Sequence, residues 1–182
     1  MEERKNTLVN TCNFRDITPI MMDLPYPPIR IKEPNQSYAN LLSIDYCGSV
    51  SEMSAIIQYI NNENYLSCEK CPLAKTILGI AIAEMIHLQK LAELIFLLGG
   101  TVDFSARYRD GKSRMWTPQY LNLSKNVREM LQFGIEAEKS AISQYRAHMK
   151  MIKDSDVNTV IYRIIQDEEY HIMVLEALMN EL

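Results

Sequence analysis

The chain has 182 residues, of which 47% are hydrophobic and 23% charged, and its net charge is −4. This length suits one domain with a substantial buried core, and the acidic balance excludes the basic surface that nucleic-acid binding needs. The polar start, Met1 to Cys12, lacks the apolar core of a signal peptide, and charged residues interrupt the most apolar run, Ile77 to Leu98. We therefore expect a soluble cytoplasmic protein with no nucleic-acid or membrane partner.

The first part of the chain is rich in proline, since five of the seven prolines precede residue 35. Proline fixes φ and lacks an amide hydrogen, so this segment cannot form a long helix. We predict an extended N-terminal arm over residues 1–36 and a single domain over residues 37–182. The four cysteines are too few and too irregularly spaced for a disulfide scaffold, so we expect free thiols.

After the arm, the hydrophobic period becomes that of long helices. We predict helices over residues 38–63, 72–98, 122–152 and 155–181, with Pro72 in a first turn and Gly99 after a last one. The connection between the second and third helices is long and contains the breakers Gly111 and Pro118. Two short connections and one long crossover predict an all-α four-helix bundle.

A Glu and a His interrupt the apolar stripe of the second predicted helix, and the same happens in the fourth. Core-facing positions recur at i, i+3, i+4 and i+7. In the second helix they are Leu73, Ile77, Ile80, Glu84, His87, Leu91, Leu94 and Leu98, and in the fourth Ile161, Ile164, Glu168, His171, Leu175 and Leu178. The two stripes correspond at an offset of 84 residues.

The first and third predicted helices repeat each other in the same way. Residues 48–59 read GSVSEMSAIIQY and residues 134–145 read GIEAEKSAISQY, with seven of twelve positions identical. This repeat aligns Glu138, rather than the neighbouring Glu136, with Glu52. Helical phase agrees, because Glu138 shares its face with Leu131 and Tyr145 while Glu136 falls toward solvent. Each half of the chain thus contributes one Glu from one helix and Glu-x-x-His from the next.

Four carboxylates on core faces would be too costly to bury as bare charges. Protonation or ion pairing could compensate, but the inward stripes offer no Lys or Arg at the matching level. Two divalent cations would balance four carboxylates with both imidazoles neutral, and this mixed ligand set favours iron, manganese or zinc. We predict a two-metal site, with two Fe ions or alternatively two Mn ions, whose ligands are Glu52, Glu84, His87, Glu138, Glu168 and His171.

The bundle region resembles the ferritin-like carboxylate proteins, which include rubrerythrins, bacterioferritins and manganese catalases. The stretches EMIHLQKLAELIFLLGG and RIIQDEEYHIMVLEAL are similar to rubrerythrin-like and bacterioferritin sequences, and GSVSEMSAIIQY resembles the first helix of manganese catalases. The resemblance implies that Glu84 and Glu168 bridge the metals, that Glu52 and His87 complete one shell, and that Glu138 and His171 complete the other. It also implies that Glu168 could stand off the metals as a catalytic base.

Three further residues are candidates for the surroundings of the metals. Tyr59 and Tyr145 each lie two turns after a single Glu, and could be hydrogen-bonded core residues, or could contact the metal ligands or relay electrons to the metals. Asp167 could orient the His of the facing helix, or be a solvated charge.

The predicted site suits three kinds of function. The first is a rubrerythrin-like oxidoreductase that reacts with peroxide or dioxygen, with an electron-donor protein as a possible partner. The second is a ferroxidase that stores iron in a homo-oligomeric shell. The third is a structural or coat-type protein that keeps its metals for stability.

Overall fold

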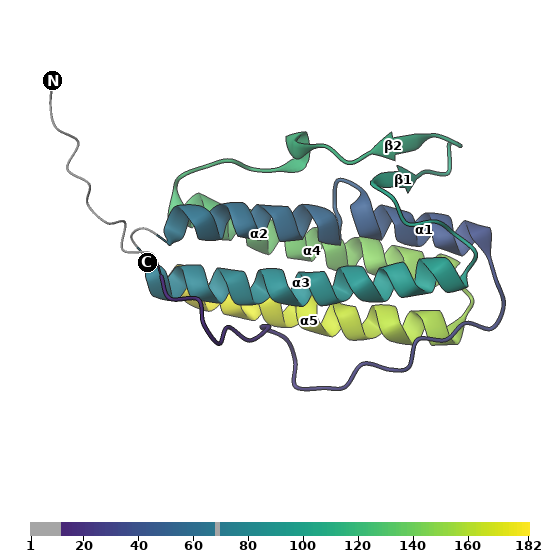
Figure 1. Cartoon of the computed structure of the whole chain (residues 1–182), viewed down its shortest axis with the longest axis horizontal. Helices are drawn as coiled ribbons and strands as arrows, with labels where there is room; N and C mark the ends of the chain where they lie inside the picture. The colour runs from purple at the N-terminus through teal and green to yellow at the C-terminus, as the bar shows by residue number, and fades with distance from the viewer. Residues whose placement is uncertain (1–11, 68–69) are drawn as a thin grey trace, which may run out of the picture.

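The computed structural model describes residues 12–67 and 70–182. Its helices are α1 (Gln36–Cys47), α2 (Glu52–Leu66), α3 (Cys71–Leu97), α4 (Val127–Met151) and α5 (Ser155–Asn180). α1 and α2 follow one another along a single rod, and this rod forms a bundle with α3, α4 and α5 (Figure 1). The predicted four-helix bundle with one long crossover is confirmed.

The first predicted helix, 38–63, is wrong as one continuous element, because the chain breaks between α1 and α2. The backbone N–H of Gly48 still donates to Ile44, but its carbonyl accepts from the hydroxyls of Ser51 and Ser54. Ser51 then caps α2 by accepting from the backbone N–H of Ser54 at 3.2 Å. Serine hydroxyls compete with helical hydrogen bonds in this way. The hydrophobic period alone does not predict such a break in the helix.

The other helix boundaries agree with the predictions except at the start of α4. The prediction began at residue 122, whereas the side chain of Asn126 caps α4 by accepting from the N–H of Glu129. α5 begins where predicted because Asp154 accepts from the N–H groups of Asp156 and Val157.

The crossover between α3 and α4 contains structure that the sequence did not predict. It forms a short antiparallel hairpin of β1 (Ser105–Arg107) and β2 (Ser113–Met115), followed by a 3-10 turn, Pro118–Tyr120. The crossover passes over α1 and α2 (Figure 1). Trp116 Nε1 donates to Ser54 Oγ at 2.9 Å, and the side-chain amide of Gln58 bonds both backbone groups of Asn122.

The N-terminal arm runs along α3 and α5 on the opposite side of the bundle (Figure 1). Ile20 N–H donates to the carbonyl of Gly79 at 2.9 Å. A Cβ on Gly79 would lie 2.8 Å from Ile20 Cγ1, so a glycine is required for this close approach.

The expectation of four free thiols is wrong for two of them. Cys12, at the start of the described arm, forms a disulfide with Cys71 at the start of α3, with Cα atoms 5.4 Å apart. The two cysteines are 59 residues apart in sequence, and only the return of the arm along α3 brings them together. Cys68 lies outside the described residues.

Apolar side chains form two core clusters, one toward each end of the bundle. One contains Leu91, Leu94, Ile161 and Ile164, and the other contains Ile77, Ile80, Leu131 and Leu175. Because the polar residues of α3 and α5 fall between these positions in sequence, the predicted site lies between the two clusters.

By length and composition, α3 could cross a membrane. Its apolar face instead packs in the bundle core, where Glu84 and His87 are fully buried against other helices. α3 is therefore the core helix of a soluble bundle.

Candidate metal centre

All six predicted ligands meet in the middle of the bundle, and all six are buried. They form two overlapping groups, each with potential ligand atoms within 4.8 Å of one another. One group holds Glu52 and His87, the other holds Glu138 and His171, and both share Glu84 and Glu168. The two halves of the sequence repeat thus each supply most of one of two neighbouring ligand groups, which are related by pseudo-symmetry.

Both histidines turn the same ring atom toward the carboxylates. Nδ1 of His87 lies 2.8 Å from a Glu84 oxygen and 3.4 Å from a Glu168 oxygen. Nδ1 of His171 lies 3.1 Å from the other Glu84 oxygen and 3.0 Å from the other Glu168 oxygen. The two rings are stacked, with centroids 5.8 Å apart. Glu84 and Glu168 therefore lie between the histidines, each reaching both.

The other ring nitrogens point away from the carboxylates to acceptors. Nε2 of His87 lies 3.2 Å from Asp167, and Nε2 of His171 lies 2.7 Å from the backbone carbonyl oxygen of Ile20. A carbonyl oxygen can only accept, so Nε2 of His171 donates and Nδ1 is left as the lone-pair atom of the neutral ring. This is the orientation that outer hydrogen bonds impose on metal-binding imidazoles.

The two tyrosines link the halves of the site crosswise. The Tyr59 hydroxyl of α2 donates to Glu138 of α4, and the Tyr145 hydroxyl of α4 donates to Glu52 of α2. Both tyrosines are almost fully buried. Each single Glu is thus held by a tyrosine of the facing helix.

Asp167 contacts His87 of the facing helix, and a network around it joins α5 to the arm. Its carboxylate accepts from Met22 N–H at 2.7 Å and from the Tyr26 hydroxyl at 2.8 Å. The buried Arg163 pairs with it at 2.6 Å and donates to the Met22 and Leu24 carbonyls.

Sequence reasoning missed Arg163, Tyr26 and the arm's carbonyl groups. The i, i+4 spacing of Arg163 and Asp167 was the available signal for that ion pair. A backbone carbonyl such as that of Ile20 has no sequence signature.

Glu52 and Glu138 each belong to only one of the two ligand groups. Both have raised pKa values when no metal is bound. Burial raises the pKa of Glu52 well above its ordinary value, and the carboxylates of Glu168 and Glu84 raise it further. Burial and the same two carboxylates also raise the pKa of Glu138. An unpaired buried charge is unfavourable, so protonation is the alternative to binding a cation.

The two imidazoles and the shared carboxylate of Glu84 shift one another's pKa values. Burial alone would lower the pKa of His87 and His171, but the Glu84 and Glu168 carboxylates outweigh it and raise both. Burial alone would raise the pKa of Glu84, but the positive charges of His171 and His87 outweigh it and lower that pKa. The pKa of Asp167 falls to about 2, because hydrogen bonds from His87 and Arg163 outweigh the effect of burial.

The residues present fit a pair of metal ions. Glu52 Oε2 and Glu84 Oε1 are buried and have no hydrogen-bond partner among the described residues. Four carboxylates and two imidazoles converge there, and Arg163, which is close by, is engaged by Asp167 and the arm. Two divalent cations would satisfy the orphaned oxygens and neutralise the four carboxylates.

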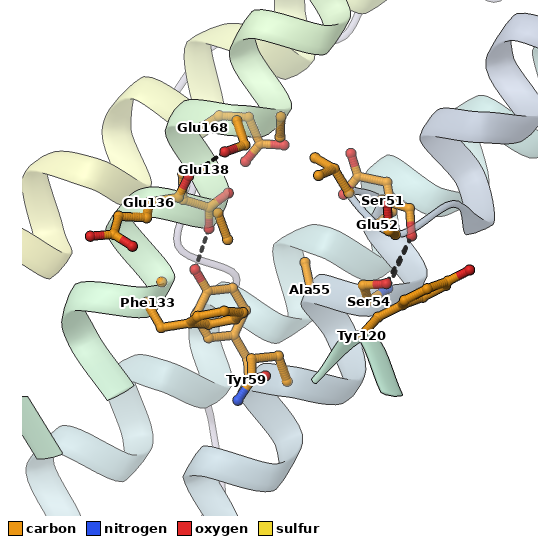
Figure 2. Close-up of a pocket in the computed structure, with 17 residues that line it drawn as sticks. Ser51, Glu52, Ser54, Ala55, Tyr59, Tyr120, Phe133, Glu136, Glu138 and Glu168 are labelled. Carbon is orange, nitrogen blue, oxygen red and sulfur yellow. Dashed lines mark hydrogen bonds between the residues drawn. The ribbon is translucent and has the colours of Figure 1, made fainter. Parts of the chain in front are cut away.

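A pocket of about 330 Å³ leads from the surface to this site between α2 and α4. Glu52, Glu138 and Glu168 lie at its inner part, and the chain between α1 and α2 lines another side (Figure 2). Glu136 is exposed and turns away from the cluster, as predicted from helical phase (Figure 2). The site is thus buried but connected to solvent.

Comparison with known proteins identifies the fold family. The model of the ferritin-like domain matches residues 50–182. The chain belongs to the ferritin-like family. Within this family it is a di-metal carboxylate type, because it carries the buried carboxylate–histidine cluster.

Its similarities point to two branches of the ferritin-like proteins. A probable manganese catalase of Clostridium acetobutylicum is 22% identical over 85% of this chain and 75% of its own length. KatB, a manganese catalase from Anabaena, superposes with a TM-score of 0.79 at 23% identity, over 88% of this chain and 78% of its own. A bacterioferritin of Rhodobacter capsulatus superposes with a TM-score of 0.67 at 21% identity, over 81% and 86%. The donor set of this ferritin-like chain, seen beside these relatives, fits iron or manganese.

Proposed function

We propose that the chain is a di-metal oxidoreductase that reacts with peroxide or dioxygen. Glu52 and His87 would hold one ion and Glu138 and His171 the other, while Glu84 and Glu168 belong to both ligand groups. The observation that carries this proposal is the pair of overlapping ligand groups sharing Glu84 and Glu168, joined to solvent by a pocket. When bound, the two ions would supply Lewis acidity, electrons and a template for the oxidant.

The residues of the chain would then orient the site and move protons. Asp167 and the Ile20 carbonyl hold the two imidazoles by Nε2, so neither ring can turn away. Tyr59 and Tyr145 fix the two outer carboxylates. Glu168 also lines the pocket; standing off the ions, its carboxylate would accept a proton from an entering peroxide, which is the role of base that we propose as the alternative to ligation.

Peroxide is the reactant that we favour, because two of the relatives are named as manganese catalases. A rubrerythrin-like peroxidase reaction would use the same residues, with an electron-donor protein as its partner. Ferroxidase and iron storage is the second candidate, and the similarity to a bacterioferritin favours it. A protein with a structural or coat-type role would bind the metals but would not turn over peroxide.

We further propose that the protein is a cytoplasmic homo-oligomer. Disulfides are rare in reducing compartments, so in the cytoplasm Cys12 and Cys71 would be reduced for much of the time. Alkylation of cells before lysis, followed by mass spectrometry of the Cys12 and Cys71 peptides, would measure their state.

The proposal is tested by loading metal-free protein with Mn(II) or Fe(II) and adding hydrogen peroxide. An oxygen electrode and the loss of peroxide absorbance would report turnover, and light scattering would report assembly size. Glu138→Ala should abolish turnover, whereas Glu176→Ala, at an exposed position of α5, should retain it. Fe(II) oxidation in a large hollow assembly with no peroxide turnover would instead establish the storage function.

A further inference from the structure

We propose that the pocket between α2 and α4 binds the organic body of a hydroperoxide, so that alkyl and aryl hydroperoxides are substrates of the site. This inference rests on the proposed peroxide chemistry and names its substrate class.

The pocket is much larger than hydrogen peroxide requires. Its volume is about 330 Å³, whereas one water molecule occupies ~30 Å³ of liquid and hydrogen peroxide has only one oxygen atom more. Pockets that bind small organic molecules begin at roughly 300 Å³. A site used only by hydrogen peroxide or dioxygen would not need this space.

Carbon dominates the walls of the pocket. The flanking helices contribute the apolar side chains of Ala55, Phe133, Ala137 and Ala141, and the connection between α1 and α2 contributes that of Val50. The small alanines leave the space open, and the Phe133 ring lies along one side (Figure 2). Burial of a hydrocarbon body against such walls is favourable by the area it removes from water.

The buried serine and glutamine side chains of the wall already have partners within the protein. Ser51 donates to Gly48 at 2.7 Å, and Ser54 donates to the same carbonyl at 3.1 Å while accepting from Trp116 at 2.9 Å. Gln58 is held by the backbone of Asn122. These groups therefore line the pocket without demanding a polar ligand beside them.

The buried polar atom of the pocket lining that lacks a partner among the described residues lies at the inner end. Glu52 is 3% exposed, and its Oε2 has no hydrogen-bond partner among the described residues. Glu138 and Glu168 lie at the same end of the pocket. A fitting ligand therefore carries a polar head that reaches the metal-binding carboxylates and an apolar body that fills the outer part, which describes an organic hydroperoxide.

The reaction balances with hydrogen peroxide as the reductant. The O–O bond of the hydroperoxide ROOH breaks, and two electrons and two protons convert it to ROH and water. Hydrogen peroxide supplies both electrons and both protons and leaves as dioxygen. The sum is ROOH + H₂O₂ → ROH + H₂O + O₂.

The binding test needs no turnover. The chain has one tryptophan, Trp116, and its hydrogen bond to Ser54, which lines the pocket, places it directly behind the pocket wall. Titration of the purified protein with 2-phenyl-2-propanol, the alcohol formed from cumene hydroperoxide, should change the Trp116 fluorescence and saturate. Ala137→Leu, which narrows the pocket, should weaken this binding at least tenfold. Ala147→Leu makes the same substitution at an exposed position of α4 and should bind like the parent protein.

The turnover test uses metal-loaded protein with cumene hydroperoxide and hydrogen peroxide together, and chromatography measures the alcohol formed. Ala137→Leu should lower the rate with cumene hydroperoxide at least tenfold more than the rate with hydrogen peroxide alone. If hydrogen peroxide is consumed while the alcohol neither binds nor forms, this inference is overturned and the proposed function stands. If neither peroxide is consumed by metal-loaded protein, both are overturned.

Discussion

The backbone carbonyl oxygen of Ile20 lies 2.7 Å from Nε2 of His171, across 151 residues of sequence. A second arm contact acts on the other histidine, because Met22 and Tyr26 hold Asp167, which in turn contacts His87. The N-terminal arm therefore completes the surroundings of both imidazoles, although it contributes none of the six candidate ligands.

The first prediction concerns this outer network. Asp167→Asn should weaken metal binding by roughly 10- to 100-fold, because His87 loses its charged acceptor and Arg163 its partner. Competition with a chromophoric chelator under anaerobic conditions would measure the affinity. Asp156→Asn, at an exposed position of the same helix, is the matched control and should bind metal normally. Equal affinities for both variants would show that the network does not support the metals.

The second prediction separates two neighbouring carboxylates of α4. Glu138→Ala should lose metal because Glu138 is buried in one of the two ligand groups. Glu136→Ala should keep the full metal content because Glu136 is exposed and, among the described residues, its carboxylate accepts only from Gln132. Elemental analysis of the two purified variants decides the matter, and a loss confined to Glu136→Ala would contradict the geometry.

The third prediction follows from the pseudo-symmetry of the site. His87→Ala and His171→Ala should each lose mainly one of the two metals, because each histidine belongs to a different ligand group. Anaerobic Fe(II) titration should then show one tight equivalent per chain for either variant. Loss of both metals from one variant and neither from the other would show that the halves are not equivalent.

The fourth prediction concerns pH. The pKa values of Glu52, Glu138, His87 and His171 are raised in the metal-free site, so these groups keep their protons to higher pH than usual and a metal must displace those protons. Affinity should therefore rise with pH, by about tenfold per pH unit for each displaced proton. Chelator competition at pH 6 and pH 8 measures this change. An affinity independent of pH would mean that the metal-free site is not protonated.

The fifth prediction concerns stability. Metal that binds only the folded chain stabilises it by about 4 kcal/mol at 1,000 times the dissociation constant, which corresponds to a melting temperature higher by about 8–16 °C for a chain of this size. Replacing Glu52, Glu84, Glu138 and Glu168 together by apolar residues should abolish metal binding and leave a folded bundle, since buried ionic groups often cost more than they return. Thermal unfolding of the metal-free, loaded and quadruple-variant proteins tests both points. A metal-free protein as stable as the loaded one, with an unfolded quadruple variant, would show that the carboxylates have a structural role instead.

Much of the site was predictable because helical phase and the internal repeat are local properties of sequence. Both selected Glu138 rather than Glu136 as the counterpart of Glu52, and the structure places Glu138 in one ligand group and Glu52 in the other, with Glu84 and Glu168 shared. The break at Gly48–Ser51 was not predicted, because apolar period continues through it while serine hydroxyls capture the Gly48 carbonyl.

Contacts made by the arm were beyond sequence reasoning for a different reason. The hydrogen bond from His171 uses a main-chain atom of Ile20, which any residue could supply. The Cys12–Cys71 disulfide depends on the path of the arm along α3. The spacing of the cysteines in the sequence does not predict that path. Both the Ile20–His171 hydrogen bond and the disulfide require the arm to pack along the bundle, and residue type alone does not predict that packing.

The central claim is that the buried cluster holds two transition-metal ions, and elemental analysis of protein purified without added metals tests it most directly. The account predicts close to two iron or manganese ions per chain, or uptake of two equivalents when Fe(II) is added anaerobically. Protein that contains no transition metal and takes up no Fe(II) would contradict it.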